Sequence, residues 1–218
     1  MKKILYHNSL SIVFLLLFVG AIVGQIYFGL AQYNKEMMED GGNPVLLSAY
    51  LQSGHFVEST FENWESEFLQ MGLFVWFTIF LRQKGSSESK DCDEKEEVDR
   101  EPDPKRKGAP WPVKKGGIWL AVYKHSLTIA LLLLFVVSFA LHFSGSRSDE
   151  NQIHALKGEP LESYTDYLAD SRFWFESFQN WQSEFLSVFA IIALSIYLRQ
   201  KGSSQSKPVD APHAETGE

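Results

Sequence analysis

Six polar residues that fall in or beside apolar stretches are the candidates for chemistry in this sequence. They are Asn63, Glu67, Asn180, Glu184, Gln25 and His142. Ionisable groups inside a membrane are costly and usually face a bundle interior, so a functional site is the default hypothesis for such a set. Because acids and an imidazole exchange protons, the set predicts a proton or small-cation pathway as one possible function.

Structural packing explains the same residues and is the favoured interpretation. Glu67 is expected one to two turns inside the outer boundary, where a carboxylate early in a helix is stabilised by roughly 0.3–1 kcal/mol. Asn63 and Asn180 can form hydrogen bonds between helices, each contributing about 0.6 kcal/mol. Trp64 and Trp181 match the aromatic belt of membrane proteins.

The segment Phe61–Phe68 organises the chain because it returns at Phe178–Phe185, an offset of 117 residues. Glu67 is retained as Glu184, whereas Glu65 becomes Gln182, so we expect Glu65 to be exchangeable.

Similarity between the two copies is uneven. Residues 61–90 and 178–207 are identical at 17 of 30 positions, whereas 25–55 and 142–172 share four. The contrast indicates that the motif helices kept their sequence after the duplication, whereas the sequences of the outer loops diverged. Each copy has two apolar runs, so the copies should share one orientation, as parallel repeats do.

Four apolar runs predict an all-α membrane protein with four transmembrane helices, arranged as two tandem hairpins. Leu10–Leu30 and Ser126–Phe143 are near the ~20 residues that a span requires. Phe68–Leu81 is too short unless its helix begins near Phe61, and Phe178–Leu198 begins with the motif itself. A cleaved signal peptide is the alternative for the first run, but its internal counterpart favours retention.

Lysine and arginine placement predicts the topology. Lys2 and Lys3 precede the first run, residues 82–115 contain ten basic residues, and Arg199 and Lys201 follow the last run. Both termini and the central loop should therefore be cytoplasmic, in a multi-pass protein of a bacterial inner (plasma) membrane.

The predicted organisation has four parts: a first two-span repeat at 1–84, a disordered cytoplasmic linker at 85–117, a second two-span repeat at 118–202 and a disordered tail at 203–218. Short interfacial helices are expected in the outer loops, near 45–51 and 160–169. Trp111 is expected at the membrane interface.

Several functions are disfavoured. Cys92 is the only cysteine, so no internal disulfide forms. The histidines lack metal-ligand spacing, and no phosphate loop or nucleophile elbow is present, so we predict no metal, no cofactor and no enzyme. The net charge of −7 lies mainly in loops and tail, which gives no indication of nucleic-acid binding.

The favoured function is therefore a packing or interaction protein whose aromatic stripe contacts another copy or another membrane protein within the lipid bilayer. The alternative is a proton or small-cation pathway through Glu67 and Glu184, assisted by His142.

Five segments carry a resemblance to a known family: Ser53–Phe56, Phe61–Gln70, Ala109–Val113, Arg172–Phe185 and Ala211–Gly217. In these motifs the chain resembles a family of small bacterial membrane proteins known only as a domain of unknown function. The resemblance covers nearly the whole length. It implies a bacterial, inner-membrane location and brings no activity or assigned residue.

Overall fold

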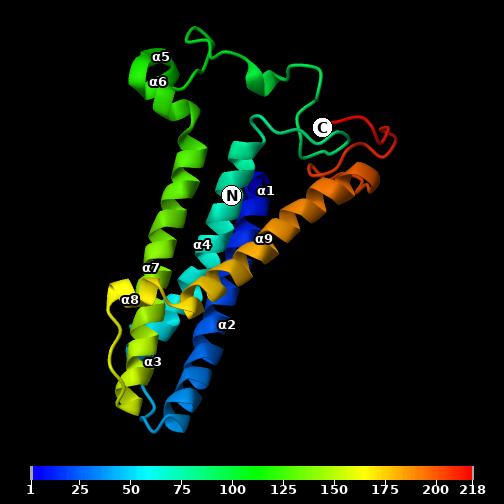
Figure 1. Ribbon diagram of the computed structural model, residues 1–218. Helices are drawn as coiled ribbons and strands as arrows, with labels where there is room; N and C mark the ends of the chain where they lie inside the picture. Colours follow the sequence, from blue (N-terminus) through cyan, green and yellow to red (C-terminus); the bar gives the residue numbers. More distant parts are fainter. Residues whose placement is uncertain (1, 218) are drawn as a thin grey trace. The chain divides into compact units, whose positions relative to one another are not determined.

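The computed structural model describes residues 2–217, and the regular elements among them are all helical. This confirms the all-α prediction. Figure 1 shows α2, α4, α7 and α9 as the long helices. The elements are α1 Lys2–His7, α2 Ser9–Glu39, α3 Leu47–Tyr50, α4 Gly54–Phe77, η1 Glu97–Asp99, α5 Trp111–Lys115, α6 Gly117–Lys124, α7 Ser126–Lys157, α8 Tyr164–Leu168 and α9 Ser171–Tyr197.

The chain forms two compact units. The first unit is Met1–Glu62 with Phe139–Phe173, and the second is Asn63–Ser138 with Trp174–Glu218. Helices α4, α7 and α9 each contribute to both. The boundaries predicted from the repeat, at residues 84, 117 and 202, stay predictions.

Two helices, α2 and α7, are long and apolar enough to cross a membrane. The apolar window of α2 contains no buried residue, which contrasts with the core helix of a soluble protein. Helices α4 and α9 do not meet the same criterion, because their first halves contain the polar motif.

The motif lies inside continuous helices. α4 begins at Gly54 and α9 at Ser171, both well before the motif, so the helical start that a span would require is present. The Ser53 hydroxyl accepts a hydrogen bond from the Phe56 amide at 3.2 Å. The Asp170 carboxylate accepts one from the Arg172 amide at 2.6 Å. With 24 residues, α4 is about 36 Å long.

The two loops before α4 and α9 are held by the same asparagine contact. Asn34 Oδ1 accepts from the Val45 amide at 2.7 Å, and its amide nitrogen donates to the Val45 carbonyl at 3.1 Å. Asn151 makes both bonds to Glu162 at the same distances. The predicted short helices are present as α3 and α8, while their placement at a membrane interface stays a prediction.

The ends of α4 and α9 are closed by arginine. The Arg82 guanidinium donates to the carbonyls of Thr78, Ile79 and Leu81, just after the last residue of α4. Arg199 repeats this pattern at the end of α9, 117 residues later. Beyond these ends the chain has turns, and the Gly85 amide donates to the Thr216 hydroxyl at 2.9 Å. Disorder of the linker and the tail stays a prediction.

Candidate functional site

Two of the predicted site residues, Glu67 and Glu184, meet in the second unit. Their carboxyl groups lie within hydrogen-bonding range of each other. Each is the fourteenth residue of its helix, and Glu67 is exposed whereas Glu184 is half-buried. The structure therefore places one carboxyl pair near the middle of two helices.

This carboxyl pair lies alongside the apolar part of α7. In this unit Gly72 of α4 contacts Leu132 of α7, and the Trp181 ring of α9 lies 6.5 Å from the Phe135 ring of α7. Glu67 lies five residues before Gly72, which is about 7.5 Å along the helix. Glu184 lies three residues after Trp181, which is about 4.5 Å along its helix. Both carboxyl groups are therefore close to the apolar run of the candidate span α7.

A third acid, Glu65, is fully buried in the same unit. Its Oε1 accepts a hydrogen bond from Trp181 Nε1 at 3.1 Å. The equivalent residue of α9, Gln182, is exposed. Glu65 and Gln182 therefore differ in burial, although they occupy equivalent positions of the repeat. The sequence signal that could have found Glu65 is Gly72, which lies seven residues later on the same helix face and marks the packed side of α4.

The other predicted residues of α4, α9 and the linker differ in exposure and in their contacts. Asn180 donates from its side chain to the Glu176 carbonyl of its own helix at 3.2 Å. Asn63 is exposed, Trp64 is half-buried and Trp111 is exposed.

Gln25 and His142 belong to the first unit. Gln25 Nε2 donates to the hydroxyls of Ser59 and Thr60 at 3.2 and 3.1 Å, which joins α2 to α4. His142 is fully buried, and its ring lies 5.0 Å from that of Phe173. Both therefore link helices within this unit.

Sequence reasoning assigned no role to a charged cluster in the first unit, where Gly54 and Gly145 allow α4 and α7 to cross in backbone contact. We call it the crossing network. Arg172 contacts Glu58 Oε1 at 3.2 Å and Asp149 Oδ2 at 3.7 Å, and it also pairs with Glu150. Glu58 and Asp149 are buried, so the guanidinium compensates charges that would otherwise be costly.

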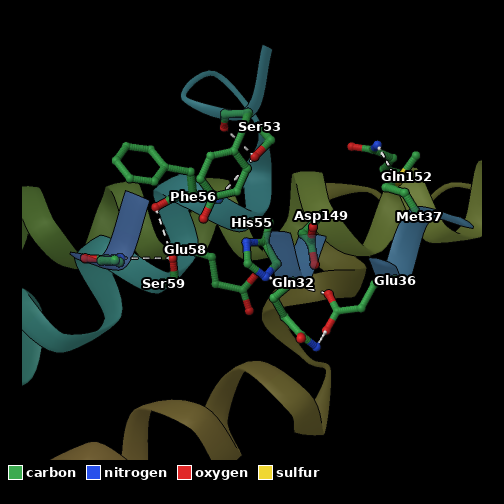
Figure 2. Close-up of polar contacts among 12 residues, drawn as sticks. Gln32, Glu36, Met37, Ser53, His55, Phe56, Glu58, Ser59, Asp149 and Gln152 are labelled. Atoms are coloured by element: carbon green, nitrogen blue, oxygen red, sulfur yellow. Dashed lines mark hydrogen bonds and ion pairs between the residues drawn. The ribbon is translucent and has the colours of Figure 1, made fainter. Parts of the chain in front are cut away.

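His55 also belongs to the crossing network, and its Nε2 lies 3.8 Å from Glu36 Oε2 (Figure 2). The nearby Tyr50 is fully buried, and burial raises the pKa of its hydroxyl, with Asp149 and Glu36 raising it further. His55 and Arg172 are equivalent positions of the repeat, and both place nitrogen atoms beside carboxylates. The crossing network joins α4, α7 and α9 through ion pairs. Among residues 2–217 no group of acids, cysteines or histidines is arranged to hold a metal ion.

Comparison with known proteins gives one result. The model of a family described as "Domain of unknown function (DUF6766)" matches residues 1–218. No curated protein and no solved structure shows significant similarity to the chain. Because the match covers the whole chain, the protein belongs to the family described as Domain of unknown function (DUF6766).

Proposed function

We propose that the chain is an integral protein of a bacterial inner membrane that acts by packing against another copy of itself or another membrane protein, and not as an enzyme. In this proposal α2, α4, α7 and α9 cross the membrane as two tandem hairpins. Both termini and the loop between α4 and α7 face the cytoplasm.

Matching contacts support the tandem arrangement. At an offset of 117 residues, Asn34 and Asn151 fix their loops in the same way, and Arg82 and Arg199 close their helices in the same way. Duplicated hairpins with one orientation would produce such pairs.

The observation that carries the proposal is the exposure of Glu67 beside Glu184 at the level of the apolar run of α7. A charged acid at a bilayer centre costs roughly 2.5–3.5 kcal/mol on insertion scales, so hydrocarbon is a poor neighbour for this pair. A protein surface that covers the pair would remove that cost. The adjacent face of α9 offers apolar contact through Phe178, Phe185 and Phe189, all exposed.

A photo-crosslinking amino acid at Phe185 tests the proposal in native membranes. We expect an adduct with a second copy or with another membrane protein. The same probe at Leu16, an apolar position of α2 that is more exposed than Phe185, serves as the control and should react less. Crosslinking at Phe185 to lipid alone would contradict the proposal. Replacing Glu67 and Glu184 together by glutamine should leave the adduct in place, because the exposed phenylalanines of α9 still supply the apolar contact.

A proton or small-cation pathway is the second candidate, and contact between two carboxyl groups favours it. A hydrogen bond between two acids needs one shared proton, and such pairs titrate in separate steps. A pH-dependent flux into liposomes that the variant Glu67→Gln with Glu184→Gln abolishes would select this function. Glu62→Gln is the matched control, because the second copy already has Gln179 there. Folded protein with no flux above that of empty liposomes would remove the candidate.

A further inference from the structure

The helices α5 and α6 form an element that the described chain leaves uncovered. Neither has a buried residue, and they pack against each other immediately before α7 (Figure 1). Ile118, Trp119 and Val122 are all exposed on α6. A helix of eight residues is not stable in water by itself, so the surroundings of α6 must stabilise it. Exposed apolar residues indicate surroundings that are partly apolar.

The same element is basic and aromatic. Residues 111–124 contain three lysines and no acid. Lys115 Nζ lies 5.0 Å from the ring of Trp111 and 5.6 Å from that of Trp119, and the two indoles meet edge to face at 5.3 Å. Lys114 is exposed beside them, while Lys124 pairs with Glu101 at 3.2 Å. We call this element the tryptophan–lysine corner.

The tryptophan–lysine corner lies immediately before the candidate span α7 in the chain. Only His125 separates α6 from α7, and the Ser126 hydroxyl bonds back to the Tyr123 carbonyl at 2.9 Å. The same bond joins Ser9 to Tyr6 at 3.0 Å, before α2. A short exposed helix therefore precedes each candidate span, and in the proposed topology both short helices lie at the cytoplasmic surface.

We propose that the tryptophan–lysine corner binds the phosphate groups of anionic phospholipids in the cytoplasmic leaflet. Lys114 and Lys115 supply the positive charge, and Trp111 and Trp119 rest at the level of the headgroups. Indole rings favour this level, and each lysine near an anionic surface attracts it. The inference rests on the membrane placement proposed above and adds a ligand class to it.

The test uses the full-length chain with Cys92→Ser and Val122→Cys, labelled at position 122 with an environment-sensitive dye and kept in a neutral detergent. Short-chain phosphatidylglycerol should shift the emission to the blue, and about 0.5 M salt should weaken the response. Phosphatidylcholine and inorganic phosphate should act weakly. Lys114→Gln with Lys115→Gln should lower the apparent affinity for phosphatidylglycerol about 10-fold or more.

The matched control is Lys95→Gln with Arg100→Gln, which removes the same charge from an exposed part of the linker and should leave the affinity unchanged. An equal response to phosphatidylcholine, an equal response to inorganic phosphate, or no response to any of the three would overturn the inference.

Labelling of the native Cys92 in sealed right-side-out vesicles tests the topology separately from the lipid site. If Cys92 reacts from the outer side of these vesicles, the proposed topology is wrong. If it reacts from the cytoplasmic side while the dye does not respond, only the lipid site is wrong.

Discussion

Placing a methyl group at the crossing of α4 and α7 should destabilise the first unit. A Cβ at Gly54 would lie 2.4 Å from the Asp149 amide nitrogen and 2.5 Å from the Gly145 carbonyl oxygen. A Cβ at Gly145 would lie 2.6 Å from the Glu58 amide nitrogen. Ordinary contact begins near 3.4 Å, so the helices would have to separate by about 1 Å. Because the nearest atoms belong to the backbone, no side-chain rotation relieves the overlap.

The expected magnitude follows from two opposing effects. Overpacking of a close contact costs about 1–3 kcal/mol. Within a helix, alanine gains about 1 kcal/mol over glycine, and this gain applies to Gly145 but little to Gly54, the first residue of α4. Gly54→Ala should therefore lower the free energy of unfolding by about 1–3 kcal/mol, and Gly145→Ala by roughly 1 kcal/mol less.

Gly20 and Gly24 provide the matched control, because nothing lies within 4 Å of a Cβ at either position. Alanine there should be neutral or stabilising by up to about 1 kcal/mol. The measurement is a reversible unfolding titration in mixed micelles, followed by circular dichroism. If Gly54→Ala proved as stable as Gly20→Ala, α4 and α7 would not be in backbone contact, and the origin given above for the crossing network would be wrong.

Two further substitution pairs compare equivalent positions of the repeat in the same unfolding titration. Tyr167→Phe removes the buried hydrogen bond to Ser146 and should cost about 0.5–1.5 kcal/mol. Tyr50→Phe deletes a buried hydroxyl for which the described residues offer no hydrogen-bond partner, and it should be neutral or stabilising. If both substitutions lowered the free energy of unfolding equally, the two tyrosine hydroxyls would not differ in hydrogen bonding. Glu65→Ala should cost about 1–3 kcal/mol, because it removes the acceptor of the buried indole bond, whereas Gln182→Ala, at an exposed position, should change stability little. Equal effects here would show that the burial of Glu65 contributes nothing.

The helices themselves could be predicted from local patterns. Long apolar runs predicted α2 and α7, and the shortness of the second run predicted a helix that begins near Phe61, whereas α4 begins seven residues earlier, at Gly54. The reason is that hydropathy and helix starts depend on residues that are near each other in the sequence.

Pairing between distant residues could not be predicted in the same way. Glu65 was expected to be exchangeable because Gln182 replaces it, yet only Glu65 is buried. Glu67 has Glu184 as its neighbour, a pairing that no local pattern reveals, and its depth near the outer boundary stays a prediction.

Local patterns along the chain are enough to predict its helical class, two apolar helices long enough to span a membrane, and its family. They do not predict which face of each motif helix is covered, and therefore which acids are buried, exposed or paired. Burial and charge pairing depend on which helices cross closely. Here glycines at residues 54, 72 and 145 set the approach of α4 to α7, and a single-residue pattern does not reveal which partner a glycine meets.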